Sequence, residues 1–126
     1  MVTWILWALI LAMLAWMGFN YLRIRRAAKI VDNEEFEALI RTGQLIDLRD
    51  PAEFHRKHIL GARNIPSSQL KTSLAVLRKD KPVLLYENQR AQRVTNAALY
   101  LKKQGFSEIY ILSYGLDSWK GKVKTS

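Results

Sequence analysis

Residues 1–22 form an apolar run that contains no Asp, Glu, Lys or Arg. At a rise of about 1.5 Å per residue, a helix of this length reaches roughly 30 Å, the thickness of a bilayer's hydrocarbon core. Trp4, Trp7, Phe19 and Tyr21 stand near its ends, where aromatic rings favour the headgroup zone. The run therefore predicts a single transmembrane helix. The alternative, a core helix buried on every side, does not fit a domain this small.

Charged residues follow the apolar run and do not precede it. Residues 1–3 carry no side-chain charge, whereas Arg23, Arg25 and Arg26 lie in a basic juxtamembrane linker over residues 23–27. A cleaved signal peptide, the second alternative, needs a basic segment before its apolar run and a small-residue cleavage site. The positive-inside rule instead predicts a signal anchor in the cell membrane, with the N-terminus outside and the remaining chain cytoplasmic.

The chain contains no cysteine, which excludes disulfides, thiolate metal sites and cysteine nucleophiles. Residues 30–126 hold 16 basic and 11 acidic residues, scattered and without a stretch in which aromatic and basic residues alternate. We therefore expect no nucleic-acid partner. His55 and His58 stand three residues apart but lack a third ligand, so we expect no metal site, and no sequence feature indicates a cofactor.

Residues 28–122 alternate short apolar strands with helices. Strands are expected at 29–31, 45–48, 62–65, 83–86 and 109–112. The continuous apolar run at 83–86 is typical of a central parallel strand. After it, Val94, Ala97, Ala98 and Leu101 fall on one face of a helix that Gly105 ends. The alternation predicts an α/β domain with a parallel sheet, in which ligands bind beyond the carboxyl ends of the strands.

Three further expectations concern local structure. Asp32 with Glu35, and Asp50 with Glu53, are capping-box patterns at helix starts. Ser67 or Ser68 is expected to cap a helix over residues 70–77, and residues 116–119 fit a last helical turn. We expect the domain to end at residue 122 and residues 123–126 to be a solvated C-terminal tail.

Three ordered motifs within residues 28–122 resemble the rhodanese-like family. They are Leu45–Phe54 (LIDLRDPAEF), His58–Pro66 (HILGARNIP) and Gly115–Trp119 (GLDSW). The resemblance implies a three-layer α/β/α domain with a five-stranded parallel sheet. In active relatives, the loop after the fourth strand begins with a cysteine that carries the transferred sulfur and closes with an arginine.

The corresponding loop here is Glu87, Asn88, Gln89, Arg90, Ala91, Gln92 and Arg93. Counted from Tyr86, the cysteine position falls on Glu87; counted back from Arg93, it falls on Asn88. Neither a carboxylate nor an amide can carry a persulfide, so sulfurtransferase activity is not expected. Three alternatives remain for the loop: an anion site that uses Arg90 and Arg93, occupation of the lost anion's place by Glu87, or simple solvation.

These observations predict a membrane-anchored, catalytically inactive rhodanese-like domain that acts as a protein-interaction or regulatory module on the cytoplasmic face. Its expected contact area is the 87–93 loop, with Arg49 and His58 as neighbours in the pocket. The first alternative is an anion or small-ligand sensor that uses this loop. The second is an enzyme with a nucleophile other than cysteine, for which Glu87 is the candidate.

Overall fold

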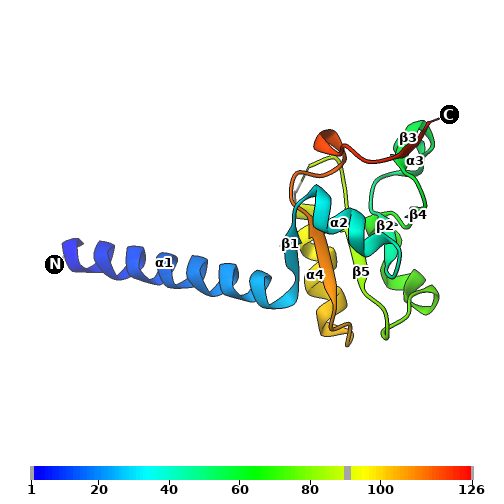
Figure 1. Ribbon diagram of the computed structural model, residues 1–126. Helices are drawn as coiled ribbons and strands as arrows, with labels where there is room; N and C mark the ends of the chain where they lie inside the picture. The colour runs from blue at the N-terminus through cyan, green and yellow to red at the C-terminus, as the bar shows by residue number, and fades with distance from the viewer. Residues whose placement is uncertain (1, 90–91, 126) are drawn as a thin grey trace.

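The computed structural model describes residues 2–89 and 92–125, and for residues 23–27 it describes the backbone alone. Helix α1 (Val2–Ala27) projects from an α/β domain that contains the remaining elements (Figure 1). Its segment Val2–Leu22 is long and apolar enough to span a bilayer, and the most apolar part of that segment is not buried against the domain. Trp4, Trp7 and Phe19 are all more than half exposed, as expected for a helix whose solvent is lipid.

The sheet contains five parallel strands in the order β1-β6-β5-β2-β4. Its strands are β1 (Lys29–Val31), β6 (Ile109–Leu112), β5 (Val83–Tyr86), β2 (Gln44–Asp47) and β4 (Arg63–Asn64). The central strand is β5, and all four of its residues are buried. This confirms the predicted five-stranded parallel sheet and its central strand.

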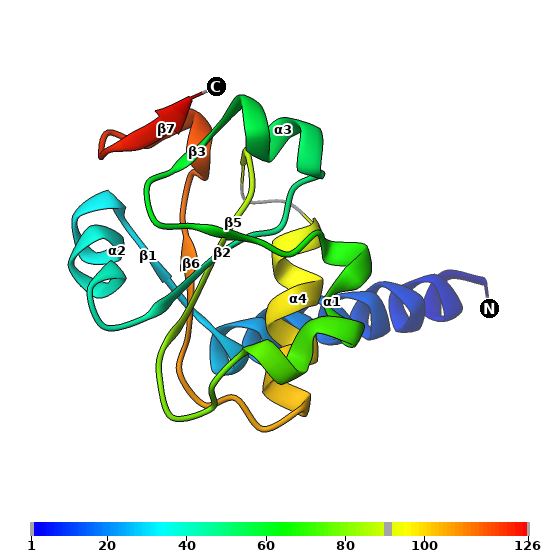
Figure 2. The ribbon, with the colours of Figure 1, turned by 90° about the vertical axis from the view of Figure 1, so that its right-hand side faces the viewer.

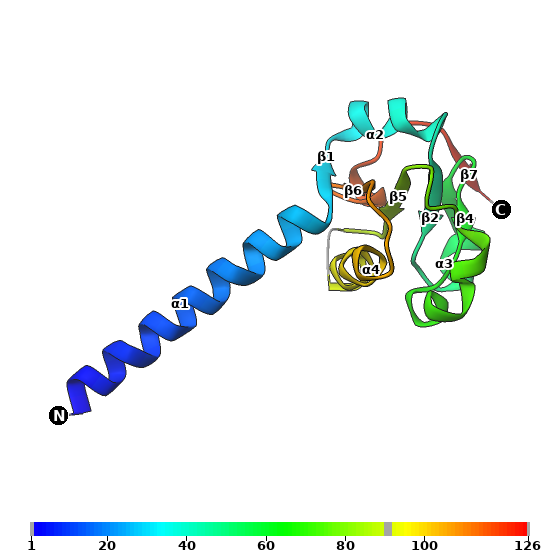
Figure 3. The ribbon, with the colours of Figure 1, turned by 90° about the horizontal axis from the view of Figure 1, so that it is seen from below.

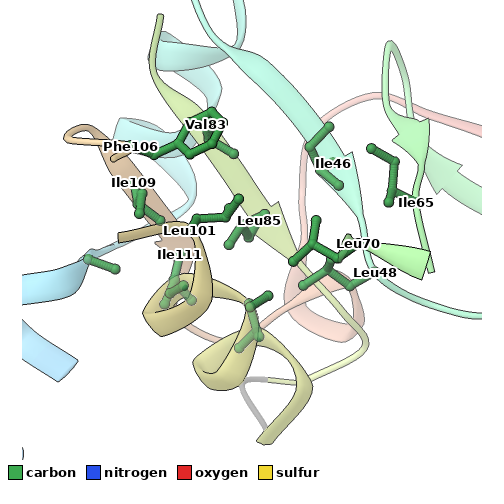
Figure 4. Packing of buried hydrophobic residues seen from close by; sticks show 14 of the residues in the cluster. Ile46, Leu48, Ile65, Leu70, Val83, Leu85, Leu101, Phe106, Ile109 and Ile111 are labelled. Atoms are coloured by element: carbon green, nitrogen blue, oxygen red, sulfur yellow. The ribbon is translucent and has the colours of Figure 1, made fainter. Parts of the chain in front are cut away.

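Helices cover both faces of the sheet (Figure 2). On one face lies α4 (Gln92–Lys103), together with the 3-10 turns η1 (Ser67–Gln69) and η2 (Lys71–Val76). Side chains of β5, β6 and α4, among them Leu85, Ile111 and Leu101, form the core between them (Figure 4). On the other face lies α2 (Asn33–Ile40), which buries Phe36 against a second cluster.

The cluster beneath α4 also contains Ala28, the first residue after α1. Helix α1 contacts α4 and leaves the domain on the α4 side of the sheet (Figure 3). It continues as a helix through residues 23–27, which agrees with the high helix propensity of Arg and Ala.

Two local expectations met different outcomes. Asp32 caps α2 by accepting a hydrogen bond from the Glu35 N–H at 2.9 Å, as predicted. At helix α3 (Pro51–Arg56), the predicted capping box is wrong, because the Asp50 side chain makes no capping bond. Glu53 is engaged elsewhere: its Oε2 accepts a hydrogen bond from Asn88.

The helix expected over residues 70–77 is also different. The chain there forms η1 and η2, and neither turn has a side-chain cap from Ser67 or Ser68. The last helical turn is present as η3 (Leu116–Ser118), with Leu116 buried.

A two-stranded antiparallel sheet was not foreseen. It pairs β3 (Lys57–Ile59) with β7 (Val123–Thr125). Both strands are three residues long and each contains one lysine, so neither shows a strand pattern of its own.

Candidate functional site at the carboxyl ends of β2 and β5

The candidate site lies where β2 and β5 end side by side. Asp47, the last residue of β2, is the register partner of Tyr86, the last residue of β5. The next residues of each segment therefore leave the sheet at the same edge, where parallel sheets place their ligands.

Asp47 and Arg49 form a buried ion pair directly after β2. The guanidinium Nη2 donates to Asp47 Oδ2 at 2.8 Å, and its Nε donates to both carboxylate oxygens. Burial disfavours the charged guanidinium, but the hydrogen bonds and charge of Asp47 outweigh burial, so the pKa of Arg49 is raised. The same side chain donates to the carbonyl of Lys57 and thereby ties the start of β3 to the end of β2.

Tyr86 joins this network from β5. Its hydroxyl donates to Asp47 Oδ2 at 2.7 Å and accepts from the Ile59 N–H at 3.1 Å. Burial raises the pKa of the Tyr86 hydroxyl, and the negative charge of Asp47 raises it further. Tyr86 is completely buried, so its hydroxyl positions neighbouring segments and does not face a ligand.

Asn88 bridges the two strand ends. Its Oδ1 accepts a hydrogen bond from Arg49 Nη1 at 3.0 Å, and its Nδ2 donates to Glu53 Oε2 at 2.8 Å. The side-chain amide of Asn88 thus accepts from the cation Arg49 and donates to the anion Glu53, which lie on either side of it. It holds the loop after β5 against α3.

Glu87, the first residue after β5, turns its carboxylate toward the start of α4. Its Oε2 accepts a hydrogen bond from the Val94 N–H at 2.8 Å, and the side chain is only 8% exposed. Amides in the first turn of a helix have no partner within the helix and attract negative charge. The observed bond corresponds to the second of the three sequence alternatives, in which Glu87 fills the anion's place.

The backbone of this loop is fixed by the segment that leads into η3. The N–H of Leu116 donates to the Glu87 carbonyl, and that of Asp117 donates to the Asn88 carbonyl. Gly115 has a φ of +68°, and a Cβ there would lie 2.4 Å from the Asn88 carbonyl oxygen. Only glycine permits this close approach, which explains the glycine that opens the third motif.

A hollow of about 470 Å³ opens above this network. Its described lining carries both signs of charge and comprises Arg49, Glu53, Arg56, Lys57, Asn88, Leu116 and Asp117. Tyr114, next to Gly115, is 72% exposed. A mixed-charge wall suits a polypeptide surface better than a single small anion.

The structure brings together some predicted residues and separates others. Arg49 and Asn88 line the hollow, and Glu87 lies beneath Asn88 in the same loop. Arg93 is exposed on α4 and lines a different hollow, beside Ser67 and Lys71. Arg90 and Ala91 lie outside the described residues.

His58 does not line the hollow in the described structure. Its Nδ1 lies 2.7 Å from the Phe54 carbonyl oxygen, and its ring stacks on that of Phe54 with centroids 3.8 Å apart. The remaining loop residues, Gln89 and Gln92, are exposed.

Sequence reasoning missed Glu53, Arg56, Lys57 and Asp117 as parts of this site. The sequence pattern places Glu53 in a capping box and gives the other three no role in a site. The available signal was the position of the α3 segment directly after β2, because everything that follows a strand's carboxyl end can reach the ligand edge.

Chemically, the described site lacks a thiol and its polar side chains bind one another. Glu87 is held by a backbone amide, and Arg49 by Asp47 and Asn88. These bonds fix the loop, and the Val94 amide has a hydrogen-bond acceptor within the chain.

The sequence of this chain is similar to those of known proteins. A sequence model of the rhodanese-like domain matches residues 32–122. The uncharacterized protein YqhL of Bacillus subtilis is 48% identical over 113 residues, which cover 90% of this chain and 89% of that protein. The thiosulfate sulfurtransferase GlpE of Stutzerimonas stutzeri is 35% identical over 95 residues, which cover 73% of this chain and 84% of that enzyme.

The fold agrees with solved structures. A rhodanese-related protein of Thermoplasma volcanium superposes with a TM-score of 0.70 at 23% identity, over 78% of this chain and 99% of that protein. A rhodanese-like domain protein of Staphylococcus aureus gives a TM-score of 0.69 at 18% identity, over 78% of this chain and 98% of that protein. With its fold, its motifs and the matched residues in agreement, this chain belongs to the rhodanese-like domain family.

Proposed function

We propose that the protein is a membrane-anchored rhodanese-like domain that has no sulfurtransferase activity and acts as a protein-interaction module. The observation that carries the proposal is the bond from the Val94 N–H to Glu87 Oε2. A carboxylate of the chain itself lies at the helix amide that would otherwise be free for a substrate anion. The absence of any cysteine removes the group that would accept sulfur.

The proposed contact surface is the mouth of the hollow above Asn88. Arg56, Lys57 and Asp117 supply charges of both signs around it, and Tyr114, two residues before Leu116 of the lining, supplies an exposed ring nearby in the chain. Tyrosine and arginine are the residue types that most often dominate binding energy at protein interfaces. The partner is therefore a polypeptide with charges of both signs.

The proposed location is the cell membrane, with α1 as a signal anchor, the N-terminus outside and the domain in the cytoplasm. Support comes from the exposed apolar surface of Val2–Leu22 and from the arginines that follow it. A reporter fused after Ser126 should resist protease added outside intact cells. Digestion of the reporter by that protease would show that the domain lies outside the cell.

The first test of inactivity uses the full chain in detergent micelles with thiosulfate as sulfur donor and cyanide as acceptor. We expect no thiocyanate above the rate without protein. A nuclear magnetic resonance titration with thiosulfate, sulfate and phosphate should leave the Glu87 and Asn88 amides unshifted at millimolar concentrations. Thiocyanate formation would contradict the proposal, and saturable shifts at these two amides that disappear in Arg93→Ala would favour the anion sensor instead.

The interaction surface is tested by placing a photoreactive residue at Tyr114 in cells. A matched position is Ala38, which is exposed on α2. We expect one discrete protein adduct from position 114, none from position 38, and loss of the adduct when Arg56→Glu is added. Adducts of equal yield from both positions, or insensitivity to Arg56→Glu, would contradict a partner at this surface.

A further inference from the structure

Charge is segregated between the two helical layers of the domain. The sequence contains no Asp or Glu from residue 54 to 79 or from residue 88 to 107. These two stretches include η1, η2 and α4, which cover one face of the sheet. Exposed basic side chains of this layer are Lys71, Lys79, Arg93, Lys102 and Lys103, whereas Arg78 is paired with Asp80.

The opposite layer has the reverse sign. Helix α2 carries Glu34, Glu35 and Glu37, all exposed, and is capped by Asp32. Its basic neighbours are Arg41 at the C-cap and Lys29, which lies 3.9 Å from Glu35, so the acidic residues outnumber the basic ones. The two sides of the sheet therefore differ in charge: the face that carries α4 is basic, and the face that carries α2 is acidic. The domain's net positive charge alone does not predict this separation, because the packing of the helices decides which face of the sheet each stretch covers.

Helix α1 joins the domain on the basic side. It contacts α4, and Ala28 packs in the core cluster beneath α4 with Ala98 and Leu101. In Figures 2 and 3, α1 runs out beside α4, while α2 and β7 lie on the far side of the domain. If α1 crosses a bilayer, the basic face is the one held nearest to its surface.

This face also contains a hollow. It has a volume of about 290 Å³ and lies between η1, η2 and the first turns of α4. Lys71 and Arg93 stand on its rim, Ser67 and Asn96 add polar groups, and its described lining holds no carboxylate. Lys71 Nζ lies 5.6 Å from the centroid of the Tyr100 ring, a contact that keeps the ammonium over the hollow.

We propose that the face formed by η1, η2 and α4 docks onto the anionic headgroups of the bilayer that α1 crosses, with Lys71 and Arg93 at the rim of the hollow binding headgroup phosphates. The proposal rests on the membrane anchor of the proposed function. Anionic lipid attracts basic residues held within a Debye length of the surface. Docking orients the domain so that the acidic α2 face and β7 point away from the bilayer.

The test uses the full chain reconstituted into vesicles. The chain has no cysteine, so Ala75→Cys on η2 and Ala38→Cys on α2 each create a single labelling position, and both alanines are exposed. A fluorophore at each position is quenched by nitroxide on lipid headgroups. One set of vesicles is phosphatidylcholine alone, and in the other about a quarter of the lipid is phosphatidylglycerol.

We expect stronger quenching at position 75 in the anionic vesicles than in the neutral ones, and weak, equal quenching at position 38. Lys71→Gln with Arg93→Gln should lower the ratio of docked to undocked domain by about fivefold per charge removed. Lys120→Gln with Lys122→Gln removes the same charge from exposed positions near β7 and should leave the ratio unchanged.

Quenching at position 75 that is independent of lipid charge overturns the docking proposal, as does an equal effect of the two variant pairs. An acidic protein partner on this face would give the first of these results. Failure of the chain to float with the vesicles is a different outcome, because it removes the membrane anchor itself and the docking proposal with it.

Discussion

The loops that follow β2 and β5 begin at the same edge of the sheet but differ in what their buried charged side chains bind. After β2, Asp47 and Arg49 neutralise each other in the interior and also bond to Tyr86 and Asn88. After β5, the Glu87 carboxylate accepts a hydrogen bond from a backbone amide of α4. The first loop is a structural clamp built on an ion pair, and in the second a carboxylate of the chain lies at a helix amide.

The difference shows which motif residues a domain can lose without losing its fold. The clamp holds β2, β3 and β5 together, so its removal exposes buried charge. A cysteine thiol at the start of the loop after β5 would serve sulfur transfer and would not hold the strands together. The motifs can therefore persist around a loop that no longer carries the catalytic residue.

Breaking the clamp should have the largest effect. Asp47→Ala leaves the buried guanidinium of Arg49 without its anion, and we expect a loss of about 3–5 kcal/mol in the free energy of unfolding. Urea unfolding of the full chain in mild detergent, followed by near-ultraviolet circular dichroism, measures it. A loss below about 1 kcal/mol would show that the pair is dispensable.

Tyr86→Phe removes a single hydroxyl from the clamp. We expect a loss of about 2 kcal/mol at neutral pH, since the Ile59 N–H and an oxygen of Asp47 each lose a partner. Burial raises the pKa of Tyr86 above its ordinary 10.0, so above pH 10 the unfolded chain releases a proton that the folded chain keeps. The stability advantage over Tyr86→Phe should shrink as pH rises from 10, in parallel urea titrations. An advantage that grows would contradict the assignment.

Glu87 is expected to matter less. Glu87→Ala removes the acceptor from the Val94 N–H, and we expect a loss of about 1 kcal/mol, comparable to deleting a helix cap. Glu87→Gln retains an acceptor oxygen and should cost less. Hydrogen exchange of the Val94 amide gives a local readout, and unchanged protection in Glu87→Ala would show that the bond does not hold the loop.

The smallest effect is expected at an exposed pair outside the site. Arg78 Nη2 lies 2.6 Å from Asp80 Oδ2, but both side chains are at least 60% exposed. The hydrogen bond from Arg78 lowers the pKa of Asp80. Because solvent and salt screen such pairs, Arg78→Ala should leave the unfolding midpoint unchanged within error. A shift comparable to that of Asp47→Ala would remove the contrast between buried and exposed pairs.

Local patterns predicted most of the fold. The strands at residues 29–31 and 83–86, the capping of α2 by Asp32, and the buried stripe of Val94, Ala97, Ala98 and Leu101 all follow from short-range periodicity. The β3–β7 pair could not be predicted, because such polar strands of three residues form only when a partner segment distant in sequence lies beside them.

The site was less predictable than the fold. The missing thiol and the unusual loop are evident from the residues alone, and so is the cation at Arg49. The bridging role of Asn88 and the displacement of Arg93 to another face depend on where α3 and α4 pack, which local patterns do not contain.

By itself, the sequence determined an apolar helix followed by an α/β domain of rhodanese-like type that cannot form a cysteine persulfide. These properties depend on composition, periodicity and residue identity along the chain. Only the tertiary structure decided that Glu87 meets the Val94 amide and that α1 lies on the basic side of the domain. Both depend on the direction in which a side chain or helix leaves a packed sheet, and packing among distant residues sets that direction.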